Sequence, residues 1–372
     1  MRAIGTYTYI YFIGIGGIGM SALARYYNQK GLQVFGYDKI QSQLTQTLVS
    51  EGITVQYAEE FIVNFIKEFP VDETLIVYTP AISKSSKAFQ FIQSKGYTIY
   101  KRAEVLGQIT KNKPTLAVAG THGKTTTSAI LTHILKANGI QLTAFCGGIL
   151  QNYNTNFIGD GEDVIVVEAD EFDRSFLQLH PIAAVVTSMD ADHLDIYGSK
   201  EQLVTTFKQF AALVPELHLY AQQGLDIKSQ SIAVNKSADF SVQNIKIKDG
   251  SYHFDFISKD LELFSVQLDL PGVHNLFNAA AALCLAIDFK PSYAQKFADA
   301  LASFKGVQRR FNYLHKSDNL VLIDDYAHHP REIDAVYQAI SEMHPGMKTV
   351  VVFQPHLFSR TQDFAAEFAK SL

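Results

Sequence analysis

Residues 115–127 of the chain, TLAVAGTHGKTTT, decide the fold of its central part. The apolar run Thr115–Ala119 predicts a buried strand, and the residues from Lys124 onward predict a helix. Between them, Gly120 and Gly123 allow a tight turn whose backbone N–H groups close around phosphate oxygens beside the positive helix start. This order of elements predicts an α/β nucleotide-binding unit.

Lys124 and Thr125 stand where such a loop needs them. A lysine at this position reaches the β- and γ-phosphates, and the threonine hydroxyl binds Mg²⁺. Only two residues separate the glycines, fewer than in the general nucleotide loop. The alternative is a glycine turn capped by threonines with no ligand, but the agreement of strand, loop, lysine and helix favours phosphate binding.

Another glycine motif, the first along the chain, occupies residues 14–19, with the pattern GxGxxG. It follows a strand expected at Tyr7–Ile15 and opens a helix expected to run to about Gln29. The next strand, expected at Gln33–Tyr37, ends at Asp38, where an acid that binds a ribose belongs. By itself the motif fits a nicotinamide-dependent dehydrogenase, a UDP-sugar site or a turn with no ligand.

Acidic residues follow two further apolar strands. Glu168 comes directly after the strand expected at Val164–Val167, and a cluster of acids and a histidine at 190–195 follows the strand expected at Ile182–Thr187. Carboxyl ends of parallel strands face the crevice where ligands bind, so Glu168 is expected to share a Mg²⁺ with Thr125. The later cluster is able to hold a second cation, and a solvated loop remains the alternative for both.

The C-terminal part repeats this arrangement. Residues 324–330, DDYAHHP, follow a strand expected at Asn319–Ile323 and precede a helix that begins at Pro330. Residues 354–361, QPHLFSRT, follow a strand expected at Thr349–Phe353. Polar groups at successive strand ends converge on one face, although N-caps and turn residues would give the same pattern.

Composition excludes several classes of protein. The formal net charge is −5 and the pI is about 6.2, so no global basic field attracts nucleic acid or an anionic membrane. Cys146 and Cys284 are the only cysteines and lie in apolar stretches, which indicates buried thiols rather than a disulfide or a zinc site. The first apolar segment, Tyr9–Met20, is too short and glycine-rich to span a membrane, so an intracellular protein is expected.

In their order along the chain, these motifs resemble the Mur ligases, and in particular the branch that adds L-alanine to UDP-N-acetylmuramic acid. The motif at residues 12–21 favours that branch over the muropeptide-recycling ligases. Those ligases, a dehydrogenase and a non-catalytic nucleotide-binding protein remain the alternatives. The resemblance covers nearly the whole chain, and its matching segments are residues 12–21, 119–127, 168–171, 192–195, 272–278, 309–311, 324–330 and 354–356.

The resemblance implies an α/β fold of three domains: a Rossmann-like domain for the UDP-sugar at 1–110, a central P-loop ATPase at 111–304 and a partial Rossmann-like ligase domain at 305–372. Alternating residues at 231–269 predict accessory antiparallel strands. The resemblance also implies that the protein takes part in cytoplasmic peptidoglycan synthesis and that its reaction passes through an acyl phosphate. ATP and Mg²⁺ are the expected cofactors, with UDP-N-acetylmuramic acid and L-alanine as substrates. Neither nucleic acid nor a membrane is expected as a partner, and a homo-oligomer stays open.

The resemblance also implies roles for single residues. The UDP-sugar is expected to contact Gly16, Gly17, Gly19, Met20, Ser21 and Asp38. ATP is expected to contact Gly120, Thr121, His122, Gly123, Lys124, Thr125, Thr126, His274, Asn275, Asn278 and Asp325. Magnesium ions are expected to bind Thr125, Glu168 and His193. The catalytic groups are expected to be Lys124, His193, Arg310, His328, His356 and Arg360.

The chain also departs from the family pattern. Family members often carry arginine where this chain has Leu357, and glycine where it has Ala327. The family's C-terminal domain normally continues well beyond the position of Leu372. A doubly wound domain needs more parallel strands than those expected here. The sequence therefore predicts a fragment whose residues from about Gly306 are poorly ordered or held by a partner, with very low ligase activity.

Overall fold

The computed structural model describes residues 6–79, 86–190, 194–248, 250–356 and 358–372. The chain divides into two compact units. The first unit comprises residues 1–116, 141–147 and 156–182, and the second comprises 117–140, 148–155 and 183–372. The chain crosses between the units several times, so neither unit is one continuous segment.

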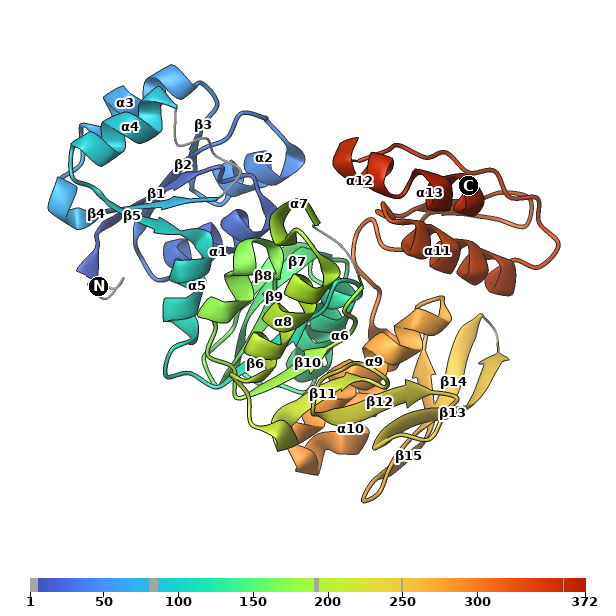
Figure 1. Cartoon of the computed structure of the whole chain (residues 1–372). Helices are drawn as coiled ribbons and strands as arrows, with labels where there is room; N and C mark the ends of the chain where they lie inside the picture. Colours follow the sequence, from blue (N-terminus) through green and yellow to red (C-terminus); the bar gives the residue numbers. More distant parts are fainter. Residues whose placement is uncertain (1–5, 80–85, 191–193, 249, 357) are drawn as a thin grey trace. The chain divides into compact units, whose positions relative to one another are not determined.

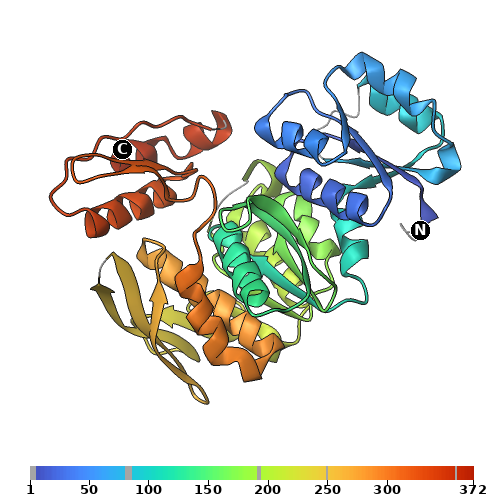
Figure 2. The same ribbon diagram turned by 180° about the vertical axis from the view of Figure 1, so that it is seen from behind.

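A parallel five-stranded sheet and its covering helices form the N-terminal part of the first unit. The elements are β1 (Tyr9–Ile13), α1 (Ile18–Gln29), β2 (Gln33–Tyr37), α2 (Gln43–Ser50), β3 (Thr54–Gln56), α3 (Glu59–Ile66), β4 (Thr74–Tyr78), α4 (Lys87–Ser94), β5 (Thr98–Lys101) and α5 (Arg102–Thr110). The strand order is β3-β2-β1-β4-β5. Figures 1 and 2 show α3 and α4 on one face and α1 and α5 on the other, which explains why β1 and β4 are almost continuously apolar.

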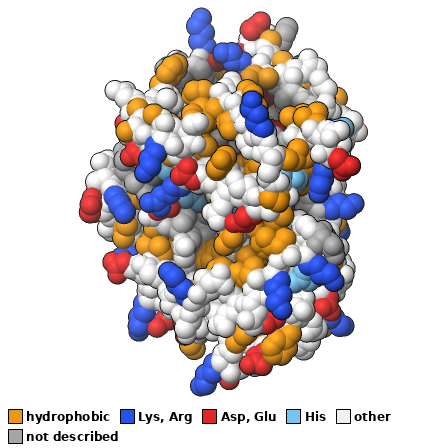
Figure 3. Space-filling model, turned by 90° about the vertical axis from the view of Figure 1, so that its right-hand side faces the viewer, with side chains coloured by type: hydrophobic (Ala, Val, Ile, Leu, Met, Phe, Trp, Pro, Cys, Tyr) orange, Lys and Arg blue, Asp and Glu red, His pale blue; other side chains and the backbone are white. Residues whose placement is uncertain are grey.

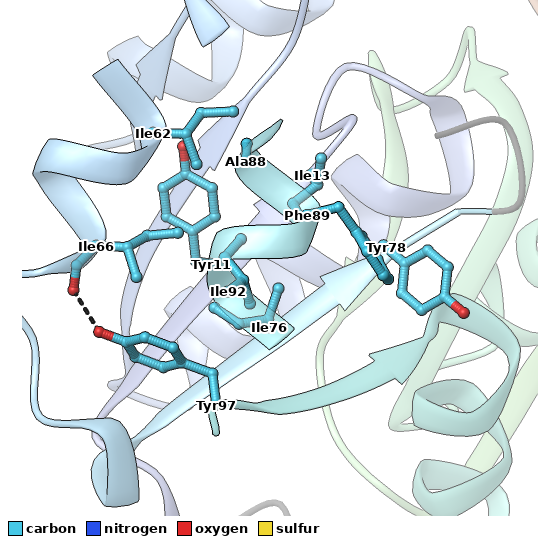
Figure 4. Close-up of a cluster of buried hydrophobic side chains, with 10 residues drawn as sticks. All are labelled: Tyr11, Ile13, Ile62, Ile66, Ile76, Tyr78, Ala88, Phe89, Ile92 and Tyr97. Carbon is cyan, nitrogen blue, oxygen red and sulfur yellow. Dashed lines mark hydrogen bonds between the residues drawn. The ribbon is translucent and has the colours of Figure 1, made fainter. Parts of the chain in front are cut away.

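One apolar core of this sheet lies between the strands β1 and β4 and the helices α3 and α4 (Figure 4). Tyr11 and Ile76 of the sheet and Ile66 and Ile92 of the helices are all buried there. Tyr97, which precedes β5, donates its hydroxyl hydrogen to the Ile66 carbonyl at 2.8 Å, so its buried polar group is satisfied. This packing supports the strand that leads into the first glycine motif.

The sequence predicted β2 with its observed bounds, and the helix expected after the first glycine motif is α1. It missed the edge strand β3. Three residues are too few to show an alternation of apolar and polar side chains, and the pairing of β3 with β2 depends on tertiary structure.

A second sheet contains ten strands in the order β15-β14-β13-β12-β11-β10-β6-β9-β7-β8. They are β6 (Thr115–Ala119), β7 (Leu142–Leu150), β8 (Thr155–Gly159), β9 (Val164–Ala169), β10 (Ala183–Val186), β11 (Leu219–Gln222), β12 (Gln230–Val234), β13 (Phe240–Lys248), β14 (Ser251–Ser258) and β15 (Glu262–Leu268). The predicted antiparallel strands are an extension of this sheet, formed by β13, β14 and β15. They begin at β13 rather than near residue 231, because β12 pairs in parallel with both of its neighbours.

The main helices of the second unit cover this sheet. They are α6 (Lys124–Ala137), α7 (Leu194–Tyr197), α8 (Lys200–Ala211), α9 (Val273–Phe289) and α10 (Ala294–Ala300). Helix α9 packs against α6 and against β10, β12 and β13. Its successive residues Ala279–Ala282 are all fully buried, as expected for a helix that is covered on every side.

The C-terminal segment contains β16 (Asn312–Lys316), β17 (Val321–Asp324), α11 (Pro330–Met343), α12 (Phe358–Asp363) and α13 (Ala365–Ser371). The strands β16 and β17 form an antiparallel pair, and α11 begins at the predicted proline. The strand predicted at Thr349–Phe353 was wrong. This described stretch pairs with no other strand, and Val350 and Val352 are 78% and 95% exposed. An apolar run forms a strand only beside a hydrogen-bonding neighbour.

The face shown in Figure 3 carries Lys and Arg side chains interspersed with Asp and Glu, and apolar side chains between them. It therefore presents no field of a single sign, which agrees with the formal net charge of −5. No helix within the described ranges is both long and apolar enough to cross a membrane.

Candidate active site

The β6–α6 loop, residues 120–123, needs glycine at both ends. Gly120 has φ +136° and Gly123 has φ +80°, which other residues rarely adopt. A Cβ on Gly120 would lie 2.0 Å from Thr187 Oγ1, and one on Gly123 would lie 2.6 Å from Asn278 Oδ1. The loop is therefore packed too closely for any side chain at these positions.

The end of strand β10 holds the β6–α6 loop in place. The hydroxyl oxygens of Thr121 and Ser188 share a hydrogen bond at 2.9 Å, and the His122 N–H donates to Ser188 Oγ at 2.8 Å. The Asp190 N–H donates to Thr121 Oγ1 at 3.0 Å. These bonds keep the shape of the loop without any contribution from a ligand.

Lys124 opens helix α6 and folds back over the loop. Its Nζ donates to the Gly120 carbonyl at 2.6 Å and lies 3.4 Å from the Thr121 carbonyl. A cation in this position adds to the partial positive charge of the helix start. Thr125 and Thr126 follow in the first turn. Lysine, threonine hydroxyl and helix start form a donor set that fits a phosphate and its Mg²⁺.

Helices α1, α6 and α9 carry predicted ligand contacts, and each begins at a glycine. Gly17, Gly123 and Gly272 occupy the N-caps. Because glycine has no side chain, none of these N-cap residues of the described structure accepts a first-turn N–H through a side chain. Serines cap the neighbouring helices α2, α4 and α8 (Ser42, Ser86 and Ser199). The glycine N-caps thus leave first-turn N–H groups for loops or ligands.

The residues expected near adenine lie at the start of α9. Asn278 Nδ2 donates to Asn275 Oδ1 at 2.9 Å, and Asn278 Oδ1 accepts from the Thr127 hydroxyl at 3.1 Å, so both amides belong to a buried link between α9 and α6. His274 is exposed to solvent yet crowded by protein atoms. That desolvation, followed by the charge of Arg310, lowers the pKa of His274 to about 4.

His122 of the β6–α6 loop lies between two carboxylates from other segments. Its Nε2 is 3.5 Å from Asp190 Oδ2, and its Nδ1 is 3.4 Å from Glu332 Oε1. Arg310 Nη1 lies 3.9 Å from the same Glu332 oxygen. The structure therefore brings two predicted residues, His122 and Arg310, together around Glu332, which sequence reasoning missed. Its one signal was its place in the first turn of the helix that follows DDYAHHP.

Asp325 accepts hydrogen bonds from its own loop and from the residue before β16. Its carboxylate accepts the Phe311 N–H at 2.6 Å and the Ala327 N–H at 2.7 Å. Burial raises the pKa of Asp325, although these two N–H groups and Arg310 oppose the shift. In this structure Asp325 holds the chain between β17 and α11.

The remaining predicted catalytic groups come from the segment before α11, from the segment between α11 and α12, and from α12. The ring centroids of His328 and His356 lie 6.2 Å apart. Burial lowers the pKa of His328 from its ordinary value, the charge of Glu332 opposes this shift, and the charge of Arg360 acts in the same direction as burial. Arg360 is buried. His193 and Leu357 lie outside the described residues.

In the first unit, Asp38 braces the first glycine motif. The Gly16 N–H donates to Asp38 Oδ2 at 2.8 Å, and a Cβ on Gly16 would lie 2.7 Å from that oxygen. Gly17 is exposed at the N-cap of α1, whereas Met20 and Ser21 are buried within the helix. The predicted substrate residues thus divide into an exposed turn and the buried residues behind it.

Arg102, which lies beside this motif, and its neighbour Lys101 were not predicted. A Cβ on Gly19 would lie 2.7 Å from Arg102 Nη1, so the Arg102 guanidinium covers the start of α1. Arg102 pairs with Asp170 at 3.1 Å, and Lys101 pairs with Asp173 at 2.7 Å. Their position at the end of the parallel strand β5 could have indicated them. The same reasoning had indicated the acidic residues at the ends of other strands.

Glu168 lies in β9, beside Gly147 of β7. A Cβ on Gly147 would lie 2.1 Å from Glu168 Oε2, so glycine makes room for this carboxylate. Glu168, Asp170 and Arg102 line one small pocket of the first unit. Carboxylate oxygens are preferred Mg²⁺ ligands, so the residue type fits its predicted role. Its expected companion, Thr125, belongs to the second unit.

Three family models match the chain. They are the Mur ligase family catalytic domain at residues 9–114, the Mur ligase middle domain at 118–286 and the Mur ligase glutamate ligase domain at 309–372. Their order along the chain is the order of the motifs.

Known proteins are similar to the chain over nearly its full length. The UDP-N-acetylmuramate–L-alanine ligase of Christiangramia forsetii is 53% identical over 376 residues, which span 100% of this chain and 82% of the relative. The crystal structure of the UDP-N-acetylmuramate-alanine ligase MurC from Thermotoga maritima matches with a TM-score of 0.83 and 29% identity, over 98% of this chain and 82% of that one. A murein peptide ligase from Psychrobacter arcticus shares the fold, with a TM-score of 0.74 and 21% identity over 94% of this chain and 81% of that one. These matches confirm the expected α/β fold, and the chain belongs to the Mur ligase family.

Proposed function

We propose that this Mur ligase joins L-alanine to the carboxylate of UDP-N-acetylmuramic acid and converts ATP to ADP and phosphate, in cytoplasmic peptidoglycan synthesis. Its 53% identity to a relative of that name supports the proposal. The structural observation that carries it is the β6–α6 loop with Lys124 Nζ folded over it, because this ligation needs a bound phosphoryl donor.

The proposal assigns one task to each of three parts of the chain. Residues 1–110 bind the UDP-sugar at the first glycine motif, with Asp38 bracing the turn. Residues 111–304 bind ATP at the β6–α6 loop. Residues 305–372 supply the groups that act on the reacting atoms, which are Arg310, His328, His356 and Arg360.

The proposed reaction has two steps. The muramate carboxylate attacks the γ-phosphorus of ATP, which gives an acyl phosphate and ADP. The deprotonated amine of L-alanine then attacks the acyl carbon and expels phosphate, which leaves an amide. Lys124 and Arg310 stabilise the negative charge that builds during transfer, and His328, whose pKa is lowered by burial, accepts the ammonium proton. Thr125, Glu168 and His193 are the residues proposed to hold Mg²⁺, which would neutralise phosphate charge when bound.

Measuring phosphate release across nucleotides, UDP-sugars and amino acids tests this function. Release that requires ATP, UDP-N-acetylmuramic acid and L-alanine together is the expected result. Release with a peptide but not with L-alanine would assign a muropeptide-recycling reaction instead. ATP binding with no release for any acceptor would indicate a nucleotide-binding protein without ligase activity, and a thermal shift with NADH alone would indicate a dehydrogenase.

A further inference from the structure

Glu332, in the first turn of α11, gathers polar groups from three separate stretches of the second unit. Its side chain is 16% exposed. His122 Nδ1 of the β6–α6 loop lies 3.4 Å from Oε1, and Arg310 Nη1 lies 3.9 Å from the same oxygen. The His328 N–H donates to Oε2 at 3.0 Å, and His328 Nδ1 lies 3.5 Å from that oxygen. The carboxylate is therefore the shared neighbour of all three groups.

The surroundings keep Glu332 ionised. Burial alone would raise the pKa of its carboxyl group, but His122, His328 and Arg310 outweigh that effect and hold the pKa well below its usual range. A buried carboxylate in this position is stable only while its partners stay close, since an uncompensated charge in the same place would be costly. The charge of Glu332 thus acts against separation of the three groups.

The residue beside Glu332 strengthens the same junction. Arg331 Nη1 pairs with Oδ1 of Asp190, a residue that follows β10. The other oxygen of Asp190 lies 3.5 Å from His122 Nε2. Both nitrogens of the His122 ring consequently face carboxylates, one beyond β10 and one at the start of α11. The β6–α6 loop and α11 are joined through this histidine.

We infer that Glu332 is a positioning residue of the ligase reaction, whose carboxylate holds His122, Arg310 and His328 in one cluster at the β6–α6 loop. The inference rests on the proposed function, because it takes these three side chains as groups of the reaction centre. Glu332 acts through them and needs no contact with substrate. Reacting groups must keep their geometry to within about 1 Å for full rate, and a single charge that faces three of them serves that need.

Glu332→Gln tests the inference, because the amide keeps the size and the acceptor for the His328 N–H but removes the charge. We expect kcat to fall by about 10- to 100-fold, while KM for UDP-N-acetylmuramic acid changes by less than about twofold. Glu332→Asp keeps the charge and should recover part of kcat. The matched control is Glu342→Gln on the same helix, where the carboxylate accepts from the Tyr252 hydroxyl at 2.6 Å. That variant should lose thermal stability without losing kcat.

A double-mutant cycle shows whether Glu332 works through the loop histidine. If it does, the loss of log kcat caused by Glu332→Gln should be smaller in the His122→Gln background than in the wild type. We expect it to be less than about half as large. Full additivity would overturn the inference, as would an unchanged kcat in Glu332→Gln. Loss of the folded state in both Glu332 variants, judged by circular dichroism, would assign the residue to stability and overturn it too. A wild-type chain that binds no UDP-N-acetylmuramic acid and releases no phosphate with all three substrates would instead count against the proposed function.

Discussion

Two aspartates that are predicted to meet a ligand also accept hydrogen bonds from backbone N–H groups of other segments. Asp38 accepts the Gly16 N–H at 2.8 Å and the Ile40 N–H at 3.0 Å, and Asp325 accepts the Phe311 N–H at 2.6 Å. A carboxylate that accepts backbone N–H groups orders the turn around it. Replacing either aspartate is therefore expected to disturb loop geometry together with ligand contacts, so neither variant alone reports on binding.

Glu168 offers a cleaner test of metal binding. Glu168→Gln removes one anionic oxygen, and Gly147→Ala should displace the same carboxylate, because the new Cβ would lie 2.1 Å from Glu168 Oε2. Both variants are expected to raise the Mg²⁺ concentration for half-maximal activity by about tenfold or more. Glu162→Gln, also in the first unit, serves as the control. An unchanged Mg²⁺ requirement in both variants would exclude Glu168 as a ligand and make Glu171 the next candidate.

Glu162 itself should make stability depend on pH. Hydrogen bonds from Lys113 and Lys30 lower the pKa of Glu162 to about 2. Since the folded pKa lies below the unfolded one, the stabilisation is present above about pH 4.5 and is lost as the pH falls toward about 2. The side chain is 42% exposed, so solvent screening limits the effect to about 0.5–1 kcal/mol. Urea unfolding of Glu162→Gln and wild type should differ at pH 7 and converge near about pH 2. A constant difference across that range would contradict the assignment.

At the scale of secondary-structure elements, the ends of helix α6 show how a glycine can serve a turn or a ligand site. Gly123 begins the helix and Gly139 follows its end, with φ +80° and +73°. Both positions require the left-handed backbone. They differ in their surroundings, because an added Cβ meets Asn278 at Gly123 and meets nothing within 4 Å at Gly139.

This contrast predicts different outcomes for the same substitution. Gly123→Ala and Gly139→Ala should each cost about 1–2 kcal/mol of stability for the left-handed backbone. Only Gly123→Ala should also weaken ATP binding, by about tenfold or more, because the loop must move away from Asn278. Calorimetric titration with ATP beside thermal unfolding measures both effects. Equal ATP affinities in the two variants would show that the exact shape of the loop is not needed for binding.

At the scale of the whole molecule, the two glycine motifs belong to different units. The first motif lies in the first unit, and the β6–α6 loop lies in the second. Each motif has its own strand, its own helix and its own bracing residues. Binding of the UDP-sugar and binding of ATP are therefore expected to respond to separate substitutions.

Lys124→Ala tests this separation. The variant should abolish ATP turnover, because it removes the cation that lies over the loop. The Kd for UDP-N-acetylmuramic acid should stay within about twofold of the wild-type value, since the two motifs belong to different units and are braced by different residues. Lys136→Ala, in the last turn of the same helix, is the control and should keep turnover. A loss of sugar affinity of roughly a hundredfold would mean that the two sites depend on each other.

Local signals account for the elements that were predicted well. The strands β2 and β6 and the start of α11 follow from apolar runs bounded by glycine, aspartate or proline, which act within a few residues. The prediction of a strand at Thr349–Phe353 was wrong because a strand also needs a hydrogen-bonded neighbouring strand. Whether a neighbour is present depends on distant parts of the chain. Arg102 was missed for a related reason, since it meets Gly19 only after β5 pairs with β4.

The sequence by itself determined the α/β class, the β6–α6 loop with Lys124 and Thr125, and the resemblance to the Mur ligases. These depend on residue types at short spacing, where chain geometry alone brings the groups together. Only the tertiary structure decided that Asp38 accepts the Gly16 N–H, that Asp325 accepts the Phe311 N–H, and that Glu332 meets His122 and Arg310. Ion pairs between distant segments form at distances set by the packing of strands and helices, and no short stretch of sequence contains that information.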